Sequence, residues 1–291
     1  MKFGVMFANT GAFAQPEHAA TLATSAEEAG LESIWAIEHV VVPDGYESTY
    51  PYDESGSMPF SDDMDLPDPL MWLTYVAAIT TRINLATGIL ILPQRNPVVL
   101  AKEVATLAQL SNGRFHLGIG VGWLEEEFDI LDVPWRQRGK RTDEMVEVMQ
   151  ALWSQPKASH HGDFYNFDNA LMHPKPPAGH VPIIIGGHSA AAARRAGRYG
   201  DGFFPGGGDV DELLQIRDVM RQAAIDHGRD PDAIEFTAGC WSPRRGTLDD
   251  VKKLEEAGVD RLIVAPPSSN PDGIRQAIEE LGERIAPVAT S

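Results

Sequence analysis

The sequence predicts an α/β fold: a single (β/α)8 or TIM barrel that spans residues 1–291. Eight short runs rich in Val, Ile and Leu alternate with longer amphipathic stretches, as strands and helices do when they alternate along a chain. Four of the seven spacings between the starts of these runs lie near the ~30 residues of a strand-plus-helix unit. The segment Glu27–Ile34 also reappears as Glu255–Leu262, with the same helix end, glycine stop and strand entry. A repeated junction within an eightfold series favours a closed barrel over an open doubly wound sheet.

The predicted strands follow the apolar runs, and helices fill the spaces between them. A capping residue precedes a proline at Asp68-Pro69 and at Asn96-Pro97, and Thr247 with Asp250 resembles a capping box, so three helices should begin there. The eight predicted strands are Lys2–Ala8, Ser33–His39, Ile83–Ile91, Arg114–Gly120, Pro182–Gly186, Gly202–Phe204, Ile234–Trp241 and Arg261–Ala265.

Two spacings are longer than the unit requires, and they predict two insertions. Val42–Asp68, after the second strand, carries eight acidic residues and no Lys or Arg. A loop between a strand and the next helix lies on the face where barrel enzymes build their active sites, so this segment is either a functional lid or a solvated acidic loop. Ser154–Val181, before the fifth strand, contains a predicted hairpin at Gly162–Phe167 with a structural or subunit-contact role.

Composition restricts the partners. The chain has 42 Asp and Glu against 24 Lys and Arg, a net charge of −18, which disfavours nucleic acid and anionic membranes. A single cysteine cannot form an internal disulfide, and no apolar run approaches the ~20 residues of a membrane span. We therefore expect a cytoplasmic protein whose substrate is a small molecule.

Candidate site residues lie at the predicted strand ends. The second strand ends in Glu38-His39, of which strand alternation allows only one to enter the barrel mouth. His39 could orient a cofactor or transfer a proton near neutral pH, or be a hydrogen-bonded structural histidine. In the third strand, Gly88 interrupts an apolar run, which indicates either a bulge beside a ligand or a bend that closes the barrel.

Two glycine-rich turns complete the candidate site. Gly118-Ile119-Gly120-Val121-Gly122 is followed by Trp123, so the backbone could approach a flat ligand with Trp123 as a wall, or simply form a tight turn. Gly186-Gly187-His188-Ser189 precedes a helix, whose free N–H groups and dipole make this turn the best phosphate candidate in the chain, with a simple capped turn as the alternative.

Basic residues are scarce, so an acidic ligand would have to meet the few near the mouth. These are Arg95, Arg136, Arg138, Lys140, Arg141, Arg244 and Arg245, each of which could instead pair with surface acids. The chain has no His-Glu-x-x-His sequence and no paired-cysteine site, and we expect no metal.

Several segments resemble the bacterial luciferase-like flavin/F420 superfamily, in particular its F420-dependent oxidoreductase branch. The resemblance runs from the first strand to Phe204 and is looser beyond it. The matching segments are Leu90–Glu103, Gly113–Phe115, Gly118–Glu126, Arg138–Glu144, His161–Tyr165, Pro174–Pro176, Pro182–Ser189 and Gly200–Gly202.

The resemblance implies a (β/α)8 barrel that binds a flavin or deazaflavin at its C-terminal mouth. It also implies a non-prolyl cis peptide at Gly88-Ile89 that backs the ring, and His39 as the catalytic residue near the reactive ring. Trp123 would line the substrate pocket. The cofactor-binding residues would be Thr87, Gly88, Ile89, Gly120, Val121, Gly122, Gly186, Gly187, His188 and Ser189.

The predicted function is an F420-dependent oxidoreductase that transfers a hydride between the deazaflavin and a small organic substrate. Two alternatives stay open: an FMN-dependent luciferase-like monooxygenase that uses O2, and a non-catalytic flavin-binding protein. The sugar-phosphate dehydrogenases of the family place a catalytic carboxylate directly after the glycine loop, where this chain has Trp123, so their activity is not carried over. By analogy with the family we also expect a homodimer.

Overall fold

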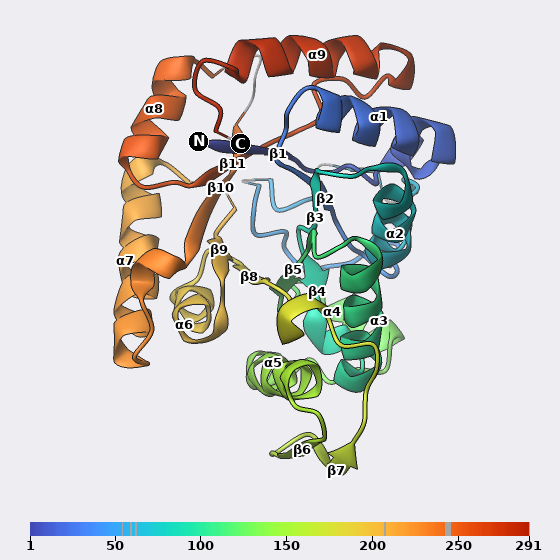
Figure 1. Cartoon of the computed structure of the whole chain (residues 1–291), viewed down its shortest axis with the longest axis vertical. Helices are drawn as coiled ribbons and strands as arrows, with labels where there is room; N and C mark the ends of the chain where they lie inside the picture. Colours follow the sequence, from blue (N-terminus) through green and yellow to red (C-terminus); the bar gives the residue numbers. More distant parts are fainter. Residues whose placement is uncertain (54, 59, 62, 207, 242–245, 291) are drawn as a thin grey trace.

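The computed structural model describes residues 1–53, 55–58, 60–61, 63–206, 208–241 and 246–290. Parallel strands form a closed barrel surrounded by helices (Figure 1). The hydrogen-bonded order is β3-β2-β1-β11-β10-β9-β8-β5-β4, and an additional β3–β5 pairing closes the ring. All eight predicted strand positions are therefore confirmed. The barrel strands are β1 (Lys2–Val5), β2 (Ser33–Ala36), β3 (Asn84–Thr87), β4 (Leu90–Ile91), β5 (Phe115–Gly120), β8 (Ile183–Gly186), β9 (Gly202–Phe204), β10 (Glu235–Trp241) and β11 (Arg261–Val264).

The third strand position is divided into two short strands. Both β3 and β4 pair with β5, at Leu85–Phe115 and at Leu90–Ile119, and the peptide bond between Gly88 and Ile89 that separates them is cis. The expected bulge and the expected non-prolyl cis bond are both confirmed. The prediction of one continuous strand over Ile83–Ile91 is wrong, because the hydrogen-bonded pairing with β5 is interrupted at this bond.

The first two strands end earlier than predicted. β1 stops at Val5, and Phe7 has φ of 59°, a value that an extended strand cannot contain. β2 stops at Ala36, because the side-chain amide of Asn9 accepts a hydrogen bond from the Ile37 N–H and donates one to the Ile37 carbonyl, both at 2.9 Å. At Ile37, a side chain thus makes the backbone hydrogen bonds that a neighbouring strand would otherwise make.

The three helices whose capping residues were identified in the sequence begin directly after those residues. Asp68 accepts from the N–H groups of Leu70 and Met71, Asn96 caps α3 in the same way, and Thr247 forms its capping box with Asp250. The helices are α1 (Pro16–Glu28), α2 (Pro69–Ile79), α3 (Pro97–Leu110), α4 (Glu125–Ile130), α5 (Arg138–Ser154), α6 (Ala190–Tyr199), α7 (Val210–Asp226), α8 (Leu248–Glu256) and α9 (Ile274–Ile285), with short 3-10 turns at Gly11–Ala14, Leu92–Gln94, Pro177–Gly179, Pro231–Ala233 and Pro271–Gly273.

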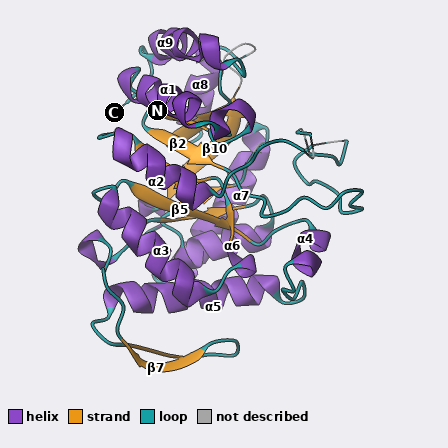
Figure 2. Cartoon of the chain, turned by 90° about the vertical axis from the view of Figure 1, so that its right-hand side faces the viewer, coloured by secondary structure: helices purple, strands orange, loops and turns teal. Residues whose placement is uncertain are grey.

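The two insertions lie on different parts of the barrel (Figure 2). The second contains the predicted hairpin, an antiparallel pair of β6 (Ala158–His161) and β7 (Asn166–Ala170) that extends away from the strands. The carboxylate of Glu144 on α5 accepts hydrogen bonds from the backbone of its turn. Within the acidic segment Val42–Asp68, the described residues form turns and coil rather than helix or strand.

The amino-terminal end of the barrel is closed by a buried charge network. Arg261, 1 % exposed, donates two hydrogen bonds of 2.8 Å to the carboxylate of Glu32 and one of 2.9 Å to Glu235. Lys2 also pairs with Glu235, and Asn84 donates to Glu32. These five residues stand at or just before the start of a strand, so they seal the end opposite to the candidate site.

None of the helices in the described part of the chain is long and apolar enough to cross a membrane. Among the described residues there is also no cluster of three or more His, Cys, Asp or Glu side chains arranged to hold a metal ion.

Candidate active site

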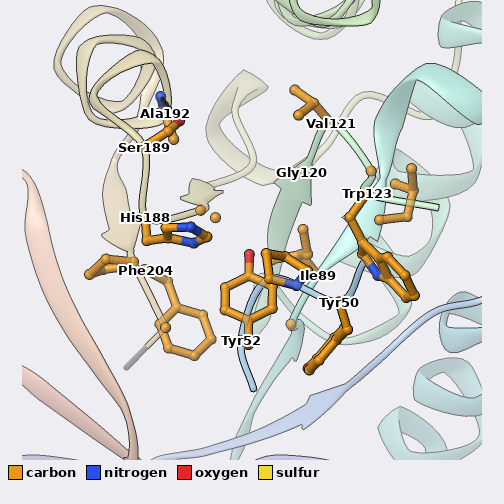
Figure 3. A pocket seen from close by; sticks show the side chains of 18 of the residues that line it. Tyr50, Tyr52, Ile89, Gly120, Val121, Trp123, His188, Ser189, Ala192 and Phe204 are labelled. Atoms are coloured by element: carbon orange, nitrogen blue, oxygen red, sulfur yellow. Dashed lines mark hydrogen bonds between the residues drawn. The ribbon is translucent and has the colours of Figure 1, made fainter. Parts of the chain in front are cut away.

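A cavity of about 1380 Å³ opens at the carboxyl ends of the barrel strands. Figure 3 shows its walls, with Trp123 and Tyr50 on one side and His188 and Ser189 on the other. Every predicted site residue lines it except Thr87, which is fully buried and donates a hydrogen bond of 2.6 Å to the Gly118 carbonyl. The lining predicted residues are His39, Gly88, Ile89, Gly120, Val121, Gly122, Trp123, Gly186, Gly187, His188 and Ser189.

Ile89 explains two of the predicted glycines. A Cβ atom at Gly120 would lie 1.8 Å from Ile89 Cδ1, and one at Gly186 would lie 2.7 Å from Ile89 Cγ2. The side chain that follows the cis bond therefore fills the space that β-carbons would need at the ends of β5 and β8. These glycines make room for Ile89 as well as lining the cavity.

His39 is held by a carboxylate that was not predicted from the sequence. Its Nδ1 lies 3.0 Å from Oε2 of Glu127, whose side chain is 1 % exposed. Glu127 belongs to α4, 88 residues further along the chain, so no local pattern connects the two. The only sequence signal was the run Glu125-Glu126-Glu127 directly after the glycine loop, in which the third acid turns inward.

Glu38 and His39 both line the cavity, which corrects the expectation that only one of them could. The alternation argument required a strand through His39, but β2 ends at Ala36. Glu38 forms an ion pair with Arg95 and accepts a hydrogen bond of 2.6 Å from the Ile91 N–H. Its carboxylate therefore joins the end of β2 to β4.

Aromatic side chains from the acidic insertion close one side of the cavity. Tyr50 packs edge-to-face on Trp123, with ring centroids 5.2 Å apart, and on Tyr52 at 5.4 Å. Tyr52 continues to His188 at 5.2 Å, so the row crosses from the β5 loop to the turn before α6 (Figure 3). Burial raises the pKa of the Tyr52 phenol. The insertion is therefore part of the cavity wall, as the lid hypothesis expected.

The turn before α6 has the geometry of an anion site. Ser189 caps the helix by accepting a hydrogen bond from the Ala192 N–H at 3.2 Å. Gly187 has φ of 116°, a backbone conformation that side-chain-bearing residues rarely adopt, and it turns the chain from β8 into the helix. The remaining first-turn N–H groups have no partner within the helix, and the helix dipole favours a negative charge beside them.

The basic residues near the mouth differ in their availability. Arg138 lines the cavity, whereas Arg95 is engaged by Glu38 and Asp68, and Arg141 lies over the ring of Phe164. Arg195, which sequence reasoning missed, also lines the cavity but pairs with Asp143. Two further candidates, Arg244 and Arg245, lie outside the described residues.

The chain matches a known family over most of its length. Residues 1–241 fit the family model for luciferase-like monooxygenases. The chain belongs to this family.

Particular relatives carry different named activities. An uncharacterized protein of Mycobacterium tuberculosis is 34 % identical over 86 % of each chain. An F420-dependent glucose-6-phosphate dehydrogenase of Kineococcus radiotolerans is 31 % identical over 76 % of this chain and 62 % of its own. An FMNH2-dependent dimethylsulfone monooxygenase of Pseudomonas fluorescens is 29 % identical over 88 % of this chain and 65 % of its own. Among solved structures, an F420-dependent secondary alcohol dehydrogenase superposes with a TM-score of 0.80 at 20 % identity and 99 % coverage of both chains, which confirms the fold.

Proposed function

We propose that the protein is an F420-dependent oxidoreductase that transfers a hydride between the deazaflavin and a small organic substrate. The observation that supports this most directly is that the cis Gly88-Ile89 bond, the glycine loop of β5 and the capped turn before α6 all line one cavity. His39 lines the same cavity.

The residues present fit such a cofactor. The side chain of Ile89 would back the flat ring, and Gly120, Val121 and Gly122 would run along its edge. The turn Gly186–Ser189 would hold the phosphate, with Arg138 as a nearby cation. When bound, the deazaflavin supplies or accepts the hydride, so the protein's part is to bind, orient and exclude water.

The substrate would be small, apolar and uncharged. The wall opposite the phosphate turn carries Tyr50 and Trp123, and the packed pair of Phe60 and Phe7 also lines the cavity. Trp123 occupies the position where the resemblance places a carboxylate in sugar-phosphate dehydrogenases. An indole there favours a substrate with apolar surface over a phosphorylated sugar.

The test is a titration of the purified protein with F420 and FMN side by side, with the bound species identified by mass spectrometry. We expect tight F420 binding without oxygen uptake. In the His39→Ala variant turnover should fall by roughly 10²- to 10⁴-fold, the usual contribution of an acid–base group, while the fold is retained. Undiminished turnover and affinity in this variant would remove His39 from the site.

An FMN-dependent monooxygenase is the second candidate, and the similarity to the FMNH2-dependent dimethylsulfone monooxygenase favours it. Oxygen consumption when reduced FMN and an apolar substrate are added would support this function over the first. A protein that binds either cofactor but neither reduces nor reoxidises it would instead be a flavin-binding protein.

A further inference from the structure

Glu127 is a buried carboxylate whose oxygens contact three consecutive residues that follow the second strand, with the side chain of Gln94 nearby. Its Oε2 lies 3.0 Å from His39 Nδ1. Its Oε1 accepts backbone hydrogen bonds from Val40 at 2.6 Å and from Val41 at 3.2 Å. The two oxygens therefore have separate roles: one holds the backbone, and the other meets the imidazole.

The protonation state of this pair follows from the donors around it. Burial alone would raise the pKa of Glu127, but the hydrogen bond and charge of His39, the side-chain amide of Gln94 and the backbone N–H groups outweigh it, and the pKa is lowered. An ionised carboxylate can only accept hydrogen bonds, so the proton between the two groups must belong to Nδ1. In the neutral imidazole, Nε2 then carries the lone pair, and it makes no hydrogen bond to the described residues.

We propose that Glu127 is a positioning residue that fixes His39 as the Nδ1–H tautomer, so that Nε2 is the proton acceptor of the site. The proposal rests on the hydride-transfer function above. In the oxidation of an alcohol to a carbonyl compound, for example, Nε2 would take the hydroxyl proton, and a bound deazaflavin would supply the acceptor for the C–H hydrogen and its two electrons. In the reverse direction the protonated Nε2 returns the proton to the carbonyl oxygen.

The geometry makes Glu127→Gln a specific test. The Val40 and Val41 N–H groups need an acceptor, so the amide oxygen must take the place of Oε1. The amide NH2 then faces His39 and donates to Nδ1, which forces the neutral ring into the Nε2–H tautomer. This substitution changes which ring nitrogen can accept a proton while keeping the size of the side chain.

The adjacent residue offers a matched control. Glu126 accepts backbone hydrogen bonds from Glu47 at 2.7 Å and Ser48 at 3.0 Å, and a side-chain bond from Ser48 at 2.7 Å. It is thus also a carboxylate of α4 that holds the chain after β2, but it does not contact His39. Glu126→Gln should leave the tautomer of His39 unchanged.

The first measurement needs no cofactor. NMR of the protein with ¹⁵N-labelled histidine, with the His39 signals assigned by their loss in His39→Gln, distinguishes the two tautomers. We expect Nδ1–H in the wild type, in Glu126→Gln and in Glu127→Asp, which keeps the carboxylate, and Nε2–H in Glu127→Gln. An Nε2–H ring in the wild type overturns the proposal even if no variant folds.

The second measurement is turnover with F420 in the direction of substrate oxidation. Glu127→Gln should lower kcat by roughly 10²-fold with KM little changed, and Glu127→Asp should recover most of the loss. If the tautomer switches but kcat does not fall, Nε2 is not the proton acceptor and the proposal fails. If the wild type does not turn over with F420, the proposed function fails, while the NMR result still decides whether Glu127 sets the tautomer.

Discussion

The two ends of the barrel use charged residues in opposite ways. At the amino-terminal end, Arg261 is buried and forms salt bridges with Glu32 and Glu235, so its charge is compensated inside the protein. At the carboxyl end, Arg138 lines an open cavity, rests on the ring of Trp135 and forms no salt bridge with the described residues. His39 likewise lines the cavity. A saturated network stabilises a fold, whereas groups with spare bonding capacity can act on a ligand, so stability and function should be separable by mutation.

The largest expected effect is on stability at the amino-terminal end. Arg261→Ala leaves the buried carboxylate of Glu32 without its partner and should lower the free energy of unfolding by about 3–5 kcal/mol. Urea denaturation measures this loss. Arg275→Ala is the control, because the Arg275–Glu28 pair is 50 % and 63 % exposed and should contribute less than about 1 kcal/mol. Equal losses in the two variants would contradict the distinction between the ends.

Acid should weaken the same network. Burial would raise the pKa of Glu32, but its hydrogen bonds and the charge of Arg261 prevail and lower it from 4.5 to about 2. A lowered folded-state pKa stabilises the protein above pH 4.5, and this contribution, about 3 kcal/mol, is lost as the pH falls towards 2. Denaturation across this range should show a smaller pH dependence in Glu32→Gln than in the wild type. Parallel curves would show that Glu32 is not the group responsible.

The strands were predictable from sequence because each carries its own apolar signal, whereas their ends were not. β2 ends at Ala36 because Asn9, a residue from a different loop, binds Ile37. Apolar patterning continues through Ile37 and contains no sign of that contact.

The candidate site shows the same limit. Its glycine turns and His39 are visible in sequence, because they stand at strand ends where ligands bind in barrels. Glu127 and Arg195 could not be identified from the sequence, because their roles depend on contacts with residues far away in the chain. Even the glycines were understood only in part, since the space at Gly120 and Gly186 is taken by Ile89.

The smallest expected effect concerns the basic residues at the carboxyl-terminal end of the barrel, where the cavity opens. On a chain of net charge −18, an anionic cofactor should be held by local groups, and Arg138 is the lining cation that forms no salt bridge with the described residues. Arg138→Gln should weaken F420 binding by about tenfold and reduce its dependence on salt, because one charge-assisted contact is lost. Isothermal titration at two ionic strengths measures both effects. Arg136→Gln, at an exposed position that does not line the cavity, should leave them unchanged. Affinity that does not vary with salt in the wild type would instead indicate a ligand recognised without its charge.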